Sequence, residues 1–245
     1  MIWIENLWKN FENKEVLTGL ELYIPRGETL VIMGRSGCGK SVLLKLITGL
    51  MKPDQGQIWV DGEDITALSR KGLNRTRQKL GMLFQSAALF DSMTVEENVG
   101  FMVSQHMKLS KREVEEIVAE KLRLVHLDGT QHLRPAELSG GMRKRVGLAR
   151  AIACNPEVIL YDEPTTGLDP ITAVEINRLI RDLHQKLQVT SVVVTHDMES
   201  AFSVGTRMAM IDQGKVIAHG TPDEIWKIDN PVLQQFISNE DFRQN

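Results

Sequence analysis

The spacing of hydrophobic and polar residues predicts strands at the start of the chain, followed by a helix. Partial alternation of apolar residues predicts strands over 2–7 and 16–24, and the apolar run 29–33 predicts a third, buried strand. Apolar residues then recur at helical spacing over 40–50. The first part of the chain is therefore expected to run through three strands and a glycine-rich loop into a helix.

The middle third has a different pattern, which predicts a helical lobe over 87–153. Ser110 is the expected N-cap of one amphipathic helix in this lobe. Strands and helices alternate again further on, because apolar runs at 158–162 and 191–195 enclose a helical pattern over 171–187. Such alternation is typical of an α/β protein with a largely parallel core sheet.

The last part of the chain predicts small elements only. Two short strands are expected on either side of Gln213 and Gly214, then a helix near 222–227 and a final amphipathic segment over 231–237.

Composition and charge narrow the class of protein. The chain has 245 residues, of which 42% are hydrophobic and 25% charged, and its net charge is −3. These values fit a globular protein and give no overall basic field that would attract a nucleic acid. The longest stretch without a charged residue, 80–90, is shorter than the roughly 20 apolar residues that cross a bilayer. Two cysteines, with no signal-peptide pattern, lead us to expect a reducing cytoplasm.

One segment has the spacing of a phosphate-binding loop. Gly34-Arg35-Ser36-Gly37-Cys38-Gly39-Lys40-Ser41 lies between a predicted strand and a predicted helix, which is the context that such a loop needs. Its glycines let backbone N–H groups turn toward one point, and the helix N-terminus adds partial positive charge. Lys40 is expected to reach the β- and γ-phosphates and Ser41 to ligate Mg²⁺. The loop therefore predicts a nucleoside triphosphate with magnesium as the ligand.

A second element for phosphoryl transfer is expected where the strand over 158–162 ends in two adjacent carboxylates. Asp162 is placed to hold the magnesium shell, and Glu163 is placed to polarise an attacking water. An acidic surface turn is the alternative, but a fully apolar strand that ends in Asp-Glu-Pro is unusual for such a turn.

The sequence Leu138-Ser139-Gly140-Gly141-Met142, followed by a basic helix and then the Asp-Glu strand, resembles the signature motif of ATP-binding cassette (ABC) ATPases. The resemblance implies a P-loop NTPase core with a mostly parallel sheet, an N-terminal antiparallel β subdomain and an inserted α-helical subdomain. It also implies one ABC domain over 1–245. In this division 1–86 and 154–220 form the core with the β subdomain, 87–153 form the helical subdomain, and 221–245 form a C-terminal extension.

The resemblance further implies a head-to-tail homodimer in which ATP bound at the phosphate loop of one chain meets Ser139, Gly140 and Gly141 of the other. Other positions match single residues of the family. They are the adenine-stacking aromatic Phe11, the Q-loop glutamine Gln85 that contacts the metal, the D-loop residue Asp169 and the switch histidine His196. ATP and Mg²⁺ are the implied cofactors, with Glu163, His196 and Gln85 as the catalytic residues.

The stretches 84–95 and 138–146 are similar to those in ATPases of Mla-type phospholipid transport systems, and the segment 231–237 is similar to the tail of that group. The similarity implies a permease of the MlaE type, an MCE-domain protein and a STAS-domain regulator as partners, with the chain peripheral at the cytoplasmic face of the inner membrane. Met142 departs from the usual glutamine of the signature, which removes any hydrogen bond that the glutamine side chain makes.

Two other functions remain open at this point. The same kind of ATPase serves importers of small polar solutes, whose substrate is recognised outside this chain. A soluble cassette protein without a membrane partner is the third possibility. Nucleic acid is not expected as a partner, because the basic residues Arg143, Lys144, Arg145 and Arg150 are interpreted as a solvated helix face without interleaved aromatics.

Overall fold

A computed structural model describes residues 1–12 and 14–238; the end of the expected C-terminal extension, 239–245, lies outside the described residues. The chain divides into two compact units. Unit 1 comprises Met1–Arg77 and Thr190–Asn245, and unit 2 comprises Gln78–Val189.

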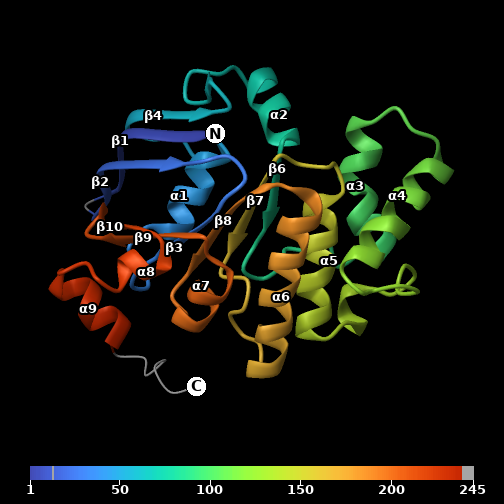
Figure 1. The fold of residues 1–245 in the computed structure, drawn as a ribbon. Coiled ribbons are helices and arrows are strands. Elements are labelled where there is room, and N and C mark those ends of the chain that lie inside the picture. The colour runs from blue at the N-terminus through green and yellow to red at the C-terminus, as the bar shows by residue number, and fades with distance from the viewer. Residues whose placement is uncertain (13, 239–245) are drawn as a thin grey trace. The chain divides into compact units, whose positions relative to one another are not determined.

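Unit 1 contains a four-stranded antiparallel sheet in the order β2-β1-β4-β5 (Figure 1). Its strands are β1 (Ile2–Phe11), β2 (Lys14–Ile24), β4 (Gln55–Val60) and β5 (Glu63–Asp64). Buried Ile2 and Ile4 alternate with exposed Trp3 and Glu5, so the pattern of period two places one face against the core. The first two strands are longer than predicted, because cross-strand pairing continues to Phe11 beyond the amphipathic part of the pattern.

Unit 1 also contains parallel strands, which carry part of the predicted site. β3 (Thr29–Met33) lies between β8 (Thr190–Thr195) and β9 (Arg207–Asp212), parallel to both, and β10 (Lys215–Gly220) pairs antiparallel with β9. Every residue of β3 and β8 is buried, as the apolar runs predicted.

The helices of unit 1 are short. They are α1 (Lys40–Ile47), α2 (Arg70–Gln78), which ends at the boundary with unit 2, α7 (Met198–Val204), α8 (Pro222–Ile225) and α9 (Pro231–Ser238). The helix predicted over 40–50 ends earlier, because Thr48 is its C-cap and Gly49 takes a left-handed backbone with φ 63°.

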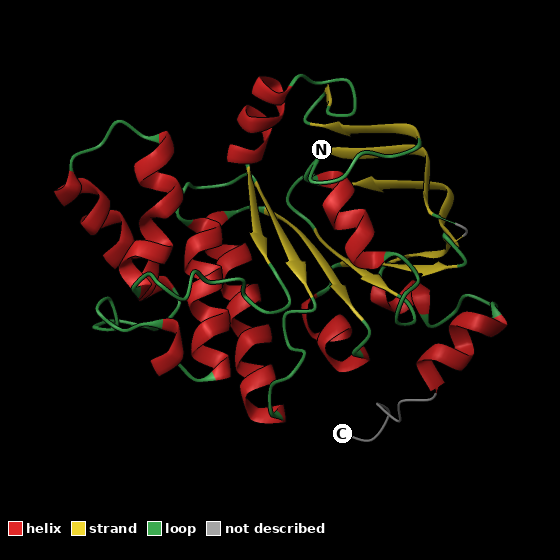
Figure 2. Ribbon diagram, turned by 180° about the vertical axis from the view of Figure 1, so that it is seen from behind, coloured by secondary structure: helices red, strands yellow, loops and turns green. Residues whose placement is uncertain are grey.

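Unit 2 contains two parallel strands, β6 (Leu80–Leu83) and β7 (Val158–Asp162), and the predicted helical lobe. Helices α3 (Val95–His106), α4 (Lys111–Leu124) and α5 (Gly140–Ile152) contact one another and lie side by side in Figures 1 and 2. A 3-10 turn, Pro135–Glu137, precedes α5, and α6 (Pro170–Leu187) follows β7.

The predicted N-cap Ser110 is confirmed. Its hydroxyl accepts a hydrogen bond from the N–H of Glu113, whose carboxylate accepts one in return from the N–H of Ser110. Within the described residues, no helix is both long enough and apolar enough to cross a bilayer. The parallel pairing of β3 with β8 and of β6 with β7, together with the antiparallel sheet and the helical lobe, confirms the predicted α/β fold class.

Candidate functional site

The predicted phosphate loop joins β3 to α1 in unit 1. Gly39, with φ 106°, is the N-cap of α1, and no side chain accepts a hydrogen bond from the first turn there. The backbone N–H groups of the first turn of α1 are therefore the donors that a phosphate needs at a helix N-terminus. A Cβ on Gly34 would lie 2.4 Å from the carbonyl oxygen of Ile211, so this position has no room for a side chain. The loop fits a phosphate chain in both its donors and its shape.

Lys40 is buried, and its ammonium is turned into the phosphate loop. Its Nζ donates to the carbonyl oxygen of Gly34 at 2.7 Å and to that of Arg35 at 3.2 Å. Cys38 lies in the same loop, where burial raises the pKa of its thiol. Its side chain is therefore a neutral group at pH 7, as expected for a small residue that only fills a tight turn.

Unit 1 brings His196 to the same edge of the sheet as the phosphate loop. Met33 pairs with Thr195 in the parallel register of β3 and β8, so Gly34 and His196 both follow the carboxyl ends of neighbouring strands. His196 is exposed there. Phe11 ends β1 with 39% of its surface exposed, and the Lys9 ammonium lies 5.6 Å from its ring centroid. An exposed ring of this kind offers a face for stacking.

Unit 2 brings Gln85, Asp162 and Glu163 together in the same way. Leu83 of β6 pairs with Tyr161 of β7, so the three residues lie at the carboxyl ends of neighbouring parallel strands, with Asp162 the last residue of β7. Both carboxylates are buried, with Asp162 6% and Glu163 8% exposed. Glu163 has a left-handed backbone, with φ 48°, and its Oε2 accepts a hydrogen bond from the Thr166 hydroxyl at 3.1 Å.

Two cations of α5, the buried Lys144 and the half-buried Arg150, hold the segment that contains Gln85. Lys144, 4% exposed, donates through Nζ to the carbonyl oxygens of Gln85 at 2.6 Å and Glu163 at 3.1 Å. Arg150 donates to the carbonyl oxygens of Ala87 at 2.6 Å and Ala88 at 2.7 Å. Both alanines have left-handed backbones, with φ 62° and 47°.

The interpretation of the basic residues of α5 as a solvated face is therefore wrong for Lys144, whereas Arg150 is half-buried. Burial lowers the pKa of Lys144 to about 8, although Asp162 and Glu163 counteract the shift. Lys144 is thus mainly an ammonium at pH 7. The signal was present in the spacing, because Lys144 follows Gly141 by three residues and precedes Leu148 by four, which places it on the buried stripe of the helix.

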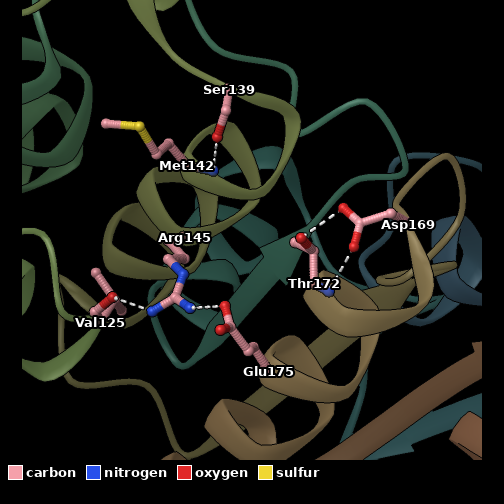
Figure 3. A network of polar contacts seen from close by, with 7 residues as sticks. All are labelled: Val125, Ser139, Met142, Arg145, Asp169, Thr172 and Glu175. Atoms are coloured by element: carbon pink, nitrogen blue, oxygen red, sulfur yellow. Dashed lines mark hydrogen bonds and ion pairs between the residues drawn. The ribbon is translucent and has the colours of Figure 1, made fainter.

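The signature residues begin α5, and the D-loop residue begins α6 (Figure 3). Ser139 is the N-cap of α5, and its hydroxyl accepts a hydrogen bond from the N–H of Met142 at 3.2 Å. Asp169 caps α6 by accepting bonds from the N–H and hydroxyl of Thr172, and these bonds lower the pKa of the Asp169 carboxyl. A Cβ on Gly141 would lie 2.6 Å from Thr172 Cγ2, so the two helix starts pack closely.

The phosphate site of P-loop nucleoside triphosphatases consists of a buried strand, a glycine loop with its lysine turned inward and a helix end without a side-chain cap. This chain has all three features and is a protein of that class. The family model described as ABC transporter matches residues 17–166. The chain therefore belongs to the ABC transporter ATPases, so it binds and hydrolyses ATP, and the resemblance noted in its sequence is confirmed.

Individual relatives are similar along nearly the whole chain. The chain is 42% identical to the "Intermembrane phospholipid transport system ATP-binding protein MlaF" of Haemophilus influenzae, over 98% of this chain and 91% of that protein. It is 40% identical to the "Probable ribonucleotide transport ATP-binding protein mkl" of Mycobacterium leprae, over 96% of this chain and 68% of that protein. Among solved structures, the ATP-binding cassette MJ0796 in a dimeric post-hydrolysis state with ADP and Pi matches with a TM-score of 0.82 at 33% identity, over 90% of this chain and 98% of that chain.

Proposed function

We propose that this chain is the ATPase subunit of a transporter that moves phospholipids between membranes, of the Mla and MCE type. The observation that carries the proposal is the 42% identity to a phospholipid-transport ATPase over 98% of the chain. The mycobacterial relative, whose name refers to ribonucleotide transport, makes a transporter of small polar solutes the second candidate.

In the proposed mechanism, unit 1 binds the phosphates of ATP. The N–H groups of the loop over 34–39 donate to the phosphate oxygens, and Lys40 moves its hydrogen bonds from the loop carbonyls to the β- and γ-phosphates. The Ser41 hydroxyl would hold Mg²⁺, which would neutralise charge at the phosphates when bound. Phe11 stacks on the adenine, and His196 contacts the γ-phosphate.

Unit 2 supplies the groups for hydrolysis. Asp162 and Gln85 would help to hold the metal, and Glu163 orients the attacking water and accepts its proton. The burial of both carboxylates supports these roles, because a carboxylate that lies away from bulk water interacts more strongly with a cation or a bound water.

We further propose that two copies of the chain pack head to tail, so that Ser139, Gly140 and Gly141 of one protomer complete the ATP site of the other. The dimeric state of the matched ATP-binding cassette supports this arrangement. Ser139 also supports it, because this residue is exposed at the start of α5, where its hydroxyl and the helix N-terminus suit an anionic group. Asp169 helps to join the two sites across the dimer interface.

A groove of about 360 Å³ between α3 and α4 supports a membrane-embedded partner. Its apolar surface comes from Met93, Phe101 and Val114. Its charged groups are the carboxylates of Glu96, Glu97 and Glu115 and the ammonium of Lys111, which lies 3.6 Å from Glu115. Cytoplasmic loops of membrane proteins carry an excess of Lys and Arg, so this acidic groove suits a helix from such a loop of a permease of the MlaE type.

The remaining partners follow from the same proposal. An MCE-domain protein would receive or deliver the lipid, a STAS-domain protein would regulate the ATPase, and the chain would lie at the cytoplasmic face of the inner membrane, held there by the permease. The name of the phospholipid-transport relative supports the position at a membrane, and the two protein partners rest on the sequence similarity to Mla-type ATPases.

Purification of the tagged chain from its native membranes in mild detergent, followed by mass spectrometry of proteins and lipids, tests the proposed function. We expect a multi-spanning permease, an MCE-domain protein and enriched phospholipid. A permease with a solute-binding protein instead would favour the second candidate, and the absence of any membrane protein would contradict both.

Glu96→Lys should weaken the association with the permease, whereas Glu116→Lys, on the exposed surface of α4 outside the groove, should not.

A further inference from the structure

One ammonium links the two segments of unit 2 that carry the proposed metal and water ligands. Lys144 Nζ lies 2.6 Å from the carbonyl oxygen of Gln85 and 3.1 Å from that of Glu163. These residues follow β6 and β7, which are neighbouring strands. Any change in the position of Gln85 therefore alters the hydrogen-bond geometry at Glu163 through a single buried group.

The backbone of Glu163 needs such support. Its φ of 48° lies in the left-handed region, which is unfavourable for a residue with a Cβ. The Lys144 ammonium binds the carbonyl of this strained residue, and the Thr166 hydroxyl binds the Oε2 atom of its side chain. Backbone and side chain of Glu163 are thus held from two directions, which fixes the direction of the carboxylate.

A packing role alone does not account for a lysine at this position. The side chain is 4% exposed, and burial of an ammonium is costly unless its donors are used. Here two of its three N–H donors bind carbonyl oxygens of segments that belong to the proposed site. An apolar side chain of similar length would fill the same space without that cost.

We propose that Lys144 is a positioning residue for ATP hydrolysis. Lys144 couples the position of the Gln85 segment to the orientation of Glu163. The inference rests on the role proposed above for Glu163. Lys144 touches neither water nor nucleotide in this account. It acts through the two carbonyl groups, so its loss should slow the chemical step while nucleotide binding at the phosphate loop of unit 1 continues.

The test compares Lys144→Met with Arg145→Met in the full-length chain. The methionine side chain is unbranched and only one heavy atom shorter than that of lysine, and it lacks the N–H donors. Arg145 is the neighbouring residue on α5 and also makes two hydrogen bonds, to the Val125 carbonyl at 3.2 Å and to Glu175 at 2.8 Å (Figure 3). Both variants lose a cation and its bonds from one helix, but only Lys144→Met releases the Gln85 and Glu163 carbonyls.

We expect Lys144→Met to lower kcat roughly 10- to 100-fold, as displacements of a reacting group do, with less than about a threefold change in KM for ATP. Arg145→Met should leave both constants near those of the unmodified chain. Lys144→Arg, which restores a cationic donor, should recover part of the lost kcat. A kcat of Lys144→Met within about twofold of that of Arg145→Met would overturn the proposal, as would a rise in KM that accounts for the whole loss of activity.

Two controls keep the result interpretable. If Lys144→Met does not fold, Lys144→Leu, which also lacks N–H donors, takes its place, and a folded Lys144→Leu with unchanged kcat overturns the proposal. Glu163→Gln is measured in parallel. If Glu163→Gln hydrolyses ATP at the normal rate, the role proposed for Glu163 is wrong. If Glu163→Gln is slow and folded Lys144→Met retains its full kcat, only the inference about Lys144 is wrong.

Discussion

At the scale of single residues, the phosphate loop depends on the position of one ammonium. Lys40 is buried at the start of α1, and two loop carbonyls accept its hydrogen bonds. This arrangement concentrates a positive charge where the proposed phosphates bind. Because the ammonium has three N–H donors and a flexible stem, it can exchange these partners for phosphate oxygens without a change in the backbone.

We expect Lys40→Ala to weaken ATP binding roughly 10- to 100-fold, since a hydrogen bond to a charged group contributes about 1.5–3 kcal/mol. Titration with a fluorescent ATP analogue measures the effect. Lys45→Ala is the matched control, because Lys45 lies on the same helix and is exposed. Equal affinities of the two variants would contradict the role of Lys40.

Glu163→Gln is expected to keep ATP binding and to slow hydrolysis by at least about 100-fold, because the amide cannot accept the proton of the attacking water. The side chain keeps its size and can still accept the Thr166 hydrogen bond. ATP should then hold the variant as a dimer, which light scattering coupled to gel filtration would detect. Normal turnover, or a variant that stays monomeric with ATP, would refute this expectation.

The residues of the phosphate loop could be predicted from sequence because their chemistry requires a fixed spacing along the chain, from Gly34 to Ser41. Burial of Lys144 could not be predicted from its residue type alone. A basic residue on a helix is usually solvated, and its burial depends on which carbonyls the rest of the fold brings to it. Here those carbonyls belong to the Gln85 segment and to Glu163.

At the scale of elements, α3 is the helix that fixes the segment before it. Asn98 is fully buried, and its Nδ2 donates to the carbonyl oxygens of Phe90, Met93 and Thr94, while its Oδ1 accepts from the N–H of Phe90. The side chain uses both its donor and its acceptor groups. One residue of α3 thereby determines the path of 90–94, which includes Met93 of the groove.

Asn98→Ala should lower the free energy of unfolding by about 2 kcal/mol or more, which corresponds to a drop of roughly 4–8 °C in melting temperature for a chain of this size. The physical reason is that the carbonyls that Asn98 binds lose their partner in the interior. Thermal melts followed by circular dichroism measure the change. Ser104→Ala, an exposed position on the same helix, should change the melting temperature little, and similar melts for both variants would contradict the expectation.

Elements were predictable wherever the hydrophobic period was complete. The buried strands β3, β7 and β8 follow their apolar runs closely, and α6 begins one residue before the predicted start. Ends of elements were less predictable, because backbone pairing decides them. The β1–β2 pairing continues through Lys9, Asn10 and Phe11, where no hydrophobic alternation marks a strand.

At the scale of the whole molecule, the proposed ATP site needs two chains. Ser139, at the exposed start of α5, is expected to act on nucleotide bound at the Lys40 of the partner protomer. Each protomer in a head-to-tail dimer then contributes one half to each of two sites. This arrangement predicts complementation between defects that are each inactive alone.

Chains with Ser139→Arg and chains with Lys40→Ala should each be inactive as homodimers, and a mixture of the two should regain ATP hydrolysis. In the mixed dimer one composite site combines both defects, while the other has an intact Lys40 and an intact Ser139. A phosphate-release assay on the mixture measures the recovery. A mixture as inactive as its components, in which mixed dimers are shown to form, would contradict the shared site.

The turn at Ala87 and Ala88 is a strained backbone that the hydrogen bonds of Arg150 hold in place. Two left-handed alanines cost roughly 2–4 kcal/mol together, and two hydrogen bonds from a charged donor such as Arg150 return about 3–6 kcal/mol. Because the two amounts are similar, the left-handed turn depends on the hydrogen bonds of Arg150. Glycine at position 87 would remove part of this backbone strain, so Ala87→Gly should melt at a higher temperature. A lower melting temperature would contradict the presence of such strain.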